Sequence, residues 1–234
     1  MPDRRPVAVF AALEMEARGL VQHLPRSETI GPKIGTWEGD GMVVVVGGVG
    51  KVAAALSAQF VQDVFKPRCM VSIGLAGALR DDTSRGQVVV ASGALQHDMD
   101  GRPLTAARGV IPGLNVSVLS ADPPLAEKLL VAAKRSVENP RVVRPGLVLT
   151  GDQIITTRAV RDALVRDFPE GACVDMETAA IAQVAHQNGL PWGAVRVTSD
   201  SADETFDLED VIDFGVKSAG ELFARIVRDA VPDL

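Results

Sequence analysis

The sequence predicts an α/β fold in which helices flank a mixed central sheet. Apolar runs of strand length alternate with segments of helical period along the 234 residues, and such alternation is typical of a parallel or mixed sheet with both faces covered. Hydrophobic residues make up 47% of the chain, which is enough for a sizeable core. No Pro/Ser-rich linker and no repeat divides the chain, so we expect a single domain over residues 1–234.

Strands are expected where β-branched and other apolar residues form short runs. One further short run, at Cys173 and Val174, ends in the carboxylate of Asp175. The polar stretch 96–113 contains Gly and Pro and predicts a long loop. The remaining runs cover residues 6–11, 42–46, 69–74, 87–91, 147–150 and 193–198.

Helices are expected where apolar residues recur with helical period. One of them stops at Gly189 with Pro191 just beyond, a combination typical of a helix C-terminus. The predicted helices cover residues 14–24, 51–65, 125–136, 160–167, 177–188 and about 208–231.

Composition and charge narrow the class of protein. The net charge is −6 and there is no run of Lys or Arg, which argues against nucleic acid or an anionic membrane surface as a partner. Cys69 and Cys173 lie in apolar runs, as buried thiols of a reducing cytosol do. Residues 1–5 precede only a short apolar run, so we expect no signal peptide. No apolar stretch approaches the roughly 20 residues of a membrane span, and we expect a cytoplasmic protein.

A glycine-rich turn at residues 47–51 follows a strand and opens a helix. A nucleotide-binding phosphate loop requires Gly and Ser or Thr where this chain has Val45 and Val52. The turn and Ala53 fit a dinucleotide fingerprint, but the next strand, ending at 74–77, lacks the acid that binds ribose. We therefore interpret it as a tight turn for close packing of helix on strand, and we expect no cofactor.

Carboxylates at two predicted strand ends are the strongest sign of a site. Ligands of open α/β sheets bind beyond the carboxyl ends of strands, where Asp200 ends one strand and where Asp175 and Glu177 lie at the junction of another strand with a helix. Strand alternation sends Asp175 and Glu177 to the same side. Aspartates in loops are also common as turn or cap residues, so the residues alone leave both interpretations open.

Acids and histidines elsewhere are less informative by themselves. Glu14 and Glu16 fall in the first turn of a predicted helix, where acids usually face solvent and favour the helix dipole. His97 is followed by Asp98 and Asp100, but no His, Cys or Asp cluster has the spacing of metal ligands. We expect no metal.

Six motifs, read together, carry a resemblance to a known family. In this order and over most of the chain they resemble the nucleoside phosphorylase superfamily, and the nearest branch is that of the 5'-methylthioadenosine/S-adenosylhomocysteine nucleosidases. The motifs are Glu-Met-Glu at 14–16, Gly-Val-Gly-Lys-Val at 48–52, Ser-Ile-Gly-Leu-Ala-Gly at 72–77, Gly-Asp-Gln at 151–153, Val-Asp-Met-Glu at 174–177 and Ser-Asp-Ser-Ala-Asp at 199–203.

The resemblance implies a three-layer α/β/α fold and cleavage of the N-glycosidic bond between ribose and adenine. It implies that Asp200 is the general acid that protonates the base at N7, which requires a raised pKa. Glu16 would be the base that deprotonates water, which reverses the solvent-facing interpretation of that residue. Glu177 would accept hydrogen bonds from the ribose hydroxyls, with Met176 as an apolar wall beneath the sugar. The resemblance also implies a homodimer.

The rest of the substrate-binding set follows from the same motifs, with three departures from the family pattern. Leu75 stands where the nucleosidases have Ser, Ile154 where they have an aromatic residue, and Asp175 where they have Glu. These departures leave the 5' substituent of the substrate open. The residues implied to bind substrate are Leu75, Ala76, Gly77, Gln153, Ile154, Asp175, Met176 and Glu177.

The sequence favours a hydrolase over a purine nucleoside phosphorylase, which would use phosphate instead of water. Both reactions stay open. Phosphate as a nucleophile needs an arginine cluster, whereas the chain has Glu16 and no arginine at 75–77; Arg18 leaves some room for phosphate. The related hopanoid-associated and futalosine branches of the family also stay open, as does a nucleoside-binding protein without catalysis.

Overall fold

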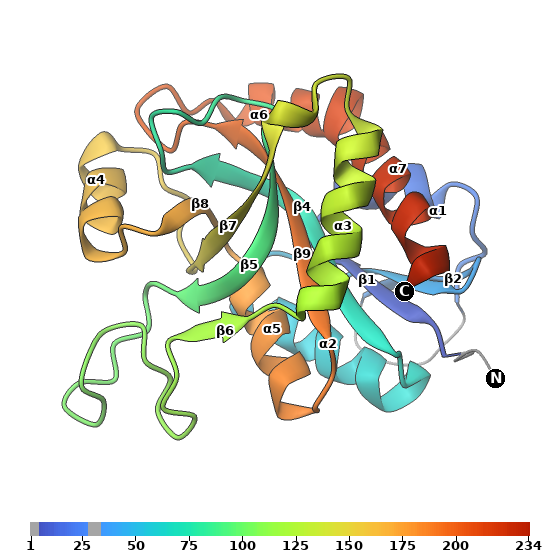
Figure 1. Cartoon of the computed structure of the whole chain (residues 1–234), viewed down its shortest axis with the longest axis horizontal. Coiled ribbons are helices and arrows are strands. Elements are labelled where there is room, and N and C mark those ends of the chain that lie inside the picture. The colour runs from blue at the N-terminus through green and yellow to red at the C-terminus, as the bar shows by residue number, and fades with distance from the viewer. Residues whose placement is uncertain (1–4, 28–33) are drawn as a thin grey trace.

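The computed structural model describes residues 5–27 and 34–234, and within them nine strands form one mixed sheet (Figure 1). The expectation about a signal peptide falls partly on residues 1–4, which lie outside the described residues. The strands are β1 (Val7–Ala11), β2 (Gly35–Gly39), β3 (Met42–Val46), β4 (Cys69–Ala78), β5 (Val88–Gln96), β6 (Val118–Ser120), β7 (Val143–Thr150), β8 (Gly171–Asp175) and β9 (Trp192–Asp200).

The helices alternate with these strands, as the sequence predicts. A π-helical segment, Gly215–Ala219, joins the last two α-helices, and short 3-10 turns lie at Pro140–Val142 and Val231–Asp233. The α-helices are α1 (Glu14–Val21), α2 (Lys51–Phe65), α3 (Pro123–Ser136), α4 (Arg158–Asp167), α5 (Thr178–Gln187), α6 (Leu208–Phe214) and α7 (Gly220–Ala230).

The sheet closes partly on itself. Its path runs β2-β3-β1-β4-β8-β7-β5-β6, and β9 pairs with both β4 and β5. Strands β4, β8, β7, β5 and β9 therefore form a closed circuit. β1, β4 and β9 run parallel to one another, so their carboxyl ends meet at one edge. The end of β8 meets the end of β4 there through an antiparallel pairing.

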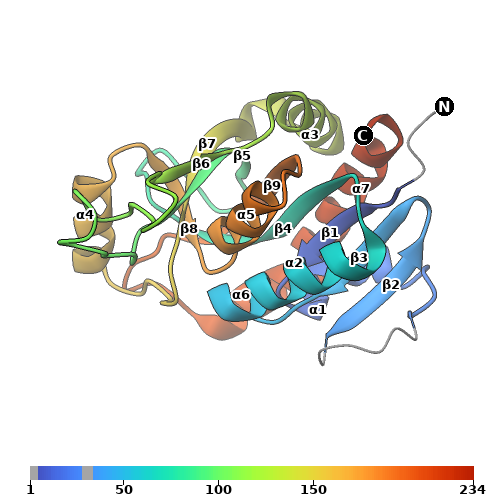
Figure 2. The same cartoon turned by 90° about the horizontal axis from the view of Figure 1, so that it is seen from below.

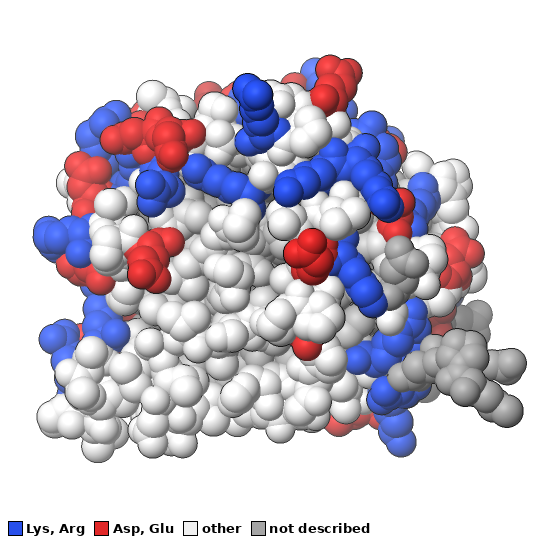
Figure 3. All heavy atoms as spheres, in the orientation of Figure 1, with Lys and Arg blue, Asp and Glu red and all other residues white. Residues whose placement is uncertain are grey.

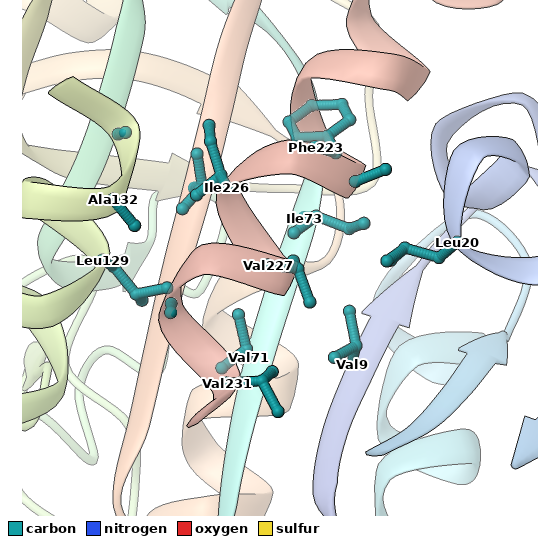
Figure 4. Packing of buried hydrophobic residues seen from close by; sticks show 14 of the residues in the cluster. Val9, Leu20, Val71, Ile73, Leu129, Ala132, Phe223, Ile226, Val227 and Val231 are labelled. Carbon is teal, nitrogen blue, oxygen red and sulfur yellow. The ribbon is translucent and has the colours of Figure 1, made fainter. Parts of the chain in front are cut away.

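Helices cover both faces of this sheet. On one side α7 contacts both α1 and α3, and on the other α2 lies beside α5 (Figure 2). The first face buries side chains of every helix in that group against the strands; Figure 4 shows Leu20 of α1, Leu129 of α3 and Phe223 of α7 facing the same core. The expectation of a mixed central sheet flanked by helices is confirmed.

The differences from the predicted elements have local causes. Strand β2 has the sequence Gly-Thr-Trp-Glu-Gly and little strand propensity of its own, but it pairs antiparallel with β3. The last predicted helix is divided into α6 and α7 by the π-helical segment Gly215–Ala219. Gly215 packs against Met15 so closely that a β-carbon would lie 2.8 Å from its sulfur. Glu177 caps α5 instead of forming its first turn.

No helix in the described ranges has the combined length and apolar character that a bilayer crossing needs. On the face shown in Figure 3, Lys and Arg side chains are interspersed with Asp and Glu, and much of the lower half carries no charged side chain.

Candidate active site

A cavity of about 230 Å³ lies where β1, β4, β8 and β9 end. All ten residues that the sequence analysis assigned to the site line it. These are Glu16, Leu75, Ala76, Gly77, Gln153, Ile154, Asp175, Met176, Glu177 and Asp200. Their roles remain predictions, but segments that are far apart in the chain do meet at this one edge of the sheet.

Glu16 has a carboxylate that backbone amides hold in place. One oxygen accepts hydrogen bonds from the amides of Ala12 and Leu13 at 3.0 and 2.9 Å, and the other accepts one from the amide of Leu75 at 2.9 Å. The contact with Leu13 caps α1, so helix capping and the site use the same side chain. The residue is 5% exposed. Burial raises the pKa of Glu16, which the Leu75 amide and the nearby charge of Arg196 oppose.

Arg196, to which the sequence analysis assigned no role, forms a buried ion pair with Asp175. Its guanidinium is 1% exposed, donates from Nε to Asp175 at 2.7 Å and from Nη2 to the hydroxyl of Ser72 at 2.7 Å. A β-carbon at Gly74 would lie 2.9 Å from both the guanidinium and the Glu16 carboxylate, so glycine is needed for this approach. An arginine within an apolar strand run was the available signal, because arginines are almost never fully buried unless paired.

Asp175 borders the cavity, but its carboxylate is engaged inside the protein. Oδ1 accepts from the hydroxyl of Thr150 at 2.6 Å, and Oδ2 accepts from Arg196 and from the amide of Thr178 at 3.1 Å. Asp175 and Glu177 line the same cavity, as expected, but so does Met176 between them. The ion pair between Asp175 and Arg196 could not be predicted from the sequence, because the pairing of β8 and β9 with β4 brings the two side chains together.

Glu177 presents one oxygen to the protein and one to the cavity. Oε1 accepts a hydrogen bond from the amide of Gly50 at 2.8 Å, and Oε2 has no partner among the described residues. Burial and the charge of Asp175 raise the pKa of Glu177 to about 7, against the effect of the Gly50 amide. The glycine turn therefore does more than allow close packing: it binds a carboxylate of the site.

An ion-pair cluster fixes that turn. Lys51 donates its amide to Asp152 at 2.8 Å and its ammonium to Asp98 at 2.6 Å, and Asp98 accepts the amide of Asp152 at 3.0 Å. The start of α2 is thus tied to the loops that follow β5 and β7. Asp98 and Asp152 thus support the segment that holds Glu177.

Asp200 ends β9 with its side chain at the cavity. Its carboxylate accepts from the Ser199 hydroxyl at 2.7 Å and from the Ala202 amide at 2.8 Å. Burial raises the pKa of Asp200, and these two hydrogen bonds oppose the change. A β-carbon at Gly77 would come within 3.2 Å of this carboxylate, so the glycine lets strand β4 lie against it. A carboxyl with a raised pKa is suited to donate a proton near neutral pH.

Apart from Gln153 and Ser199, the rest of the wall is apolar, and much of it was not expected from the sequence. Ile154 and Met176 had been assigned, but the residues of α6 had not, because their pattern is that of any amphipathic helix. Within the described part of the chain, no Lys, Arg or His lines the cavity. The additional apolar lining residues are Ala12, Leu13, Met15, Val49, Ile155, Val174, Phe206, Leu208, Val211 and Ile212.

Histidine plays no part in this site. His97 is 2% exposed and packs against Gly151, and burial lowers its pKa. Within residues 5–27 and 34–234, no group of three His, Cys, Asp or Glu side chains is placed to hold a metal ion.

The raised pKa of Glu177 predicts how stability depends on pH. The folded protein keeps a proton on Glu177 up to a pKa of about 7, whereas the unfolded chain releases it near the ordinary value of about 4.3. Between these values the folded state binds more protons, so the free energy of unfolding falls as pH rises. Glu177→Gln should reduce this fall between about pH 5 and pH 8, by about 1–3 kcal/mol.

Urea denaturation at about pH 5 and about pH 8 measures the free energy of unfolding of each variant. Glu170→Gln, at an exposed residue, is the control. The same pH dependence in Glu177→Gln and the unmodified protein would contradict the assignment.

Comparison with known proteins gives one consistent result. The model of the phosphorylase superfamily matches residues 6–232. Two curated 5'-methylthioadenosine/S-adenosylhomocysteine nucleosidases are similar over nearly their whole lengths. That of Anoxybacillus flavithermus is 30% identical over 95% of this chain and 98% of its own. That of Shewanella piezotolerans is 31% identical over 94% and 98%.

Solved structures agree with the sequence matches. The nucleosidase of Neisseria meningitidis in complex with methylthio-immucillin-A has a TM-score of 0.88 and 30% identity, over 98% of this chain and 100% of that one. The S-adenosylhomocysteine nucleosidase of Streptococcus pyogenes in complex with 5-methylthiotubericidin has a TM-score of 0.89 and 28% identity, over 100% and 98%. The chain thus belongs to the phosphorylase superfamily and is similar throughout its length to the 5'-methylthioadenosine/S-adenosylhomocysteine nucleosidases.

Proposed function

We propose that the protein hydrolyses the N-glycosidic bond of a 5'-modified adenine nucleoside and releases adenine. The observation that carries this proposal is the convergence of Glu16, Glu177 and Asp200 on one largely apolar cavity. The names of the similar nucleosidases support the same reaction class.

Asp200 acts as the general acid. Departure of adenine leaves charge on the base, and protonation at N7 removes it in the transition state. Burial keeps a proton on this carboxyl at higher pH than usual, which is what a proton donor near neutrality requires. The Ser199 hydroxyl and the Ala202 amide hold the carboxyl in one orientation.

Glu177 binds the ribose. Its Oε2 has no partner among the described residues, whereas Gly50 holds Oε1. A free carboxylate oxygen at the cavity accepts hydrogen bonds from the sugar hydroxyls, and Met176 lies next to it as an apolar surface for the ring. Both roles follow the assignment made from the sequence motifs.

Glu16 activates the attacking water, and Asp175 acts through Arg196. The Glu16 carboxylate is fixed by three amides, so it can take a proton without moving. The carboxylate of Asp175 is engaged with Arg196, Thr150 and Thr178, and we assign it the positioning of that arginine rather than contact with substrate. Leu75, Ala76, Gly77, Gln153 and Ile154 form the wall for base and sugar.

Water, not phosphate, is the nucleophile. A phosphate dianion needs cationic donors, and no Lys or Arg of the described chain lines the cavity. Arg196 is behind the wall and already bonded to Asp175 and Ser72. Glu16 at the nucleophile side would repel a dianion.

Release of adenine from 5'-modified adenosines should therefore proceed at the same rate with and without inorganic phosphate. The measurement is chromatography of adenine from 5'-methylthioadenosine and related thioethers, in phosphate-free and phosphate buffers. Formation of the correspondingly 5-modified ribose 1-phosphate, together with a strict need for phosphate, would replace hydrolase by phosphorylase. No release from any nucleoside would remove the proposal.

Asp200→Asn should lower kcat for adenine release by about 10²–10⁴-fold, because the amide keeps the shape but cannot donate the proton. Glu16→Gln should lower kcat by a similar factor, because the amide cannot deprotonate the attacking water. Asp82→Asn, at an exposed carboxylate away from the cavity, is the matched control and should keep the full rate. Unchanged kcat in Asp200→Asn would disprove its role as the acid.

We also propose that the enzyme is a homodimer. The proposal is supported by apolar side chains that remain in contact with solvent: Val52 and Leu56, four residues apart on α2, are 81% and 54% exposed, and Leu104 is 86% exposed. Lys51 and Asp98 tie the start of α2 to the loop that carries Leu104. Exposed apolar groups that gather in one region mark interfaces.

Light scattering should give a mass of about twice 24.6 kDa, and Val52→Glu should shift it towards one chain. Val131→Glu, at a partly exposed apolar residue of α3, is the control. A monomer at micromolar concentration would contradict the dimer. A cytoplasmic location is a separate proposal, supported by the buried thiol of Cys173, which forms no disulfide among the described residues, and cell fractionation tests it.

A further inference from the structure

Helix α4 is tied to the segment that follows the proposed general acid. This helix stands at one end of the molecule, beyond β8 (Figure 1). The connection 201–207 leads from the end of β9 to α6. Arg158, the first residue of α4, donates its amide to Glu204 at 3.0 Å and its Nη2 to Asp203 at 3.3 Å. These two contacts hold the middle of the connection against the start of the helix.

Arg161 holds the beginning of the same connection. It lies three residues after Arg158, a spacing that places both side chains on one helix face. Its Nη1 donates to the carbonyl oxygen of Ser201 at 3.4 Å, and its Nη2 donates to the carboxylate of Asp81. Asp81 belongs to the connection between β4 and β5. The guanidinium therefore joins α4 to two other segments of the chain.

Stability alone does not account for the burial of Arg161. The residue is 6% exposed, and its Nε has no hydrogen-bond partner among the described residues. A buried donor without a partner is unfavourable, so a purely structural contact would be better made by another side chain. Arg161 does not line the cavity. Any effect that it has on the reaction must therefore pass through the residues that it contacts.

The carbonyl that Arg161 holds belongs to the same peptide unit as the amide of Ala202. That amide donates to Oδ1 of Asp200 at 2.8 Å. The unit is trans, so it is planar and its C=O and N–H bonds point in opposite directions. Because the Ser201 oxygen is turned toward α4, the Ala202 amide points away from the helix and meets the carboxyl. One peptide unit thus links the guanidinium to the general acid.

Ala202 has a backbone conformation that needs support. Its φ of 51° lies in the left-handed region, which the β-carbon of an L-residue disfavours. The residue is buried, and its β-carbon faces β4, where a β-carbon at Gly77 would lie 3.0 Å from it. Strained residues persist where neighbouring contacts determine their conformation, and they cluster at active sites. Arg161 supplies such a contact on the peptide that precedes Ala202.

We propose that Arg161 is a positioning residue for the general acid. Its guanidinium fixes the peptide unit between Ser201 and Ala202, and this unit keeps the Asp200 carboxyl turned toward the leaving adenine. The inference rests on the proposed function, in which Asp200 protonates the base. The hydroxyl of Ser199 holds the other carboxyl oxygen at 2.7 Å, so loss of Arg161 frees one side of the carboxyl and leaves the other bonded.

Arg161→Met tests this role, because it keeps an apolar stem and removes the guanidinium. We expect kcat for adenine release to fall by about 10- to 100-fold, the size of effect that a misplaced reacting group produces. KM should change by less than about twofold, because the residues that bind substrate are unaltered. Arg166→Met, at an exposed arginine of the same helix, is the matched control and should keep both values.

A double-mutant cycle with Asp200→Asn separates positioning from a structural role. The amide cannot donate the proton, so its orientation no longer limits the rate. In that background, Arg161→Met should lower the residual kcat by less than about twofold, because residues that act as a unit are strongly non-additive. A merely structural arginine would give the same fold loss in both backgrounds.

Asp81→Asn is a second variant, which changes no buried group. The Asp81 side chain is 87% exposed, so the fold should tolerate the substitution, while Arg161 loses its ionic partner. We expect kcat to fall by about two- to fivefold, the size of a partly exposed ion pair, and the loss to disappear when residue 200 is already Asn. Asp82→Asn, at the next carboxylate along the chain, is the control and should keep the full rate. Circular dichroism verifies the fold of each variant.

Unchanged kcat in Arg161→Met, or an equal loss in both backgrounds, would overturn this inference and leave the proposed function intact. If Arg161→Met does not fold, the same two outcomes for Asp81→Asn decide the question. Full kcat in Asp200→Asn, or no adenine released from any nucleoside, would overturn the proposed function and this inference together. A loss of kcat at constant KM that vanishes in the Asp200→Asn background is the result that supports it.

Discussion

The buried guanidinium of Arg196 is the interaction on which the site depends. Asp175, Glu177 and Glu16 lie around it, and three carboxylates in so small a buried volume repel one another. One fixed cation, bonded to Asp175 and Ser72, offsets that repulsion in part. Removing one member of a buried ion pair typically costs about 3–5 kcal/mol. Together with burial, the repulsion from Asp175 that remains raises the pKa of Glu177 to about 7.

The closed circuit of strands makes this arrangement possible. Strand β9 pairs with β4 and with β5, so Arg196 enters the interior from the same strand that ends in Asp200. The end of β8 is brought against the end of β4, which places Asp175 beside the guanidinium. Gly74 then leaves space for Glu16. In an open sheet, β8 and β9 would lie apart, and Asp175 could not contact Arg196.

Much of the fold could be read from the sequence, for reasons visible in particular segments. The strand Met42–Val46 could be predicted because four of its five residues are valine, which has a high strand propensity. Helix α5 ends at Gln187, just before the Gly189 and Pro191 that predict its C-terminus. Strand β2 could not be found, since its two glycines and a Glu have meaning only beside β3. Residues of the site were found through motifs, whereas Leu208 and Ile212 of α6 carried no signal that separates a cavity wall from an ordinary helix face.

The sequence by itself determined most of the elements, where two strands end in acids, and which family the motifs resemble. These are properties of neighbours along the chain. Only the tertiary structure decided what each acid faces: Asp175 an arginine, Glu177 a backbone amide and an open cavity, Asp200 a hydroxyl and an amide. The physical reason is that a carboxylate's pKa and availability depend on burial and on partners from distant segments. Strand pairing and sheet closure, not local sequence, bring those partners together.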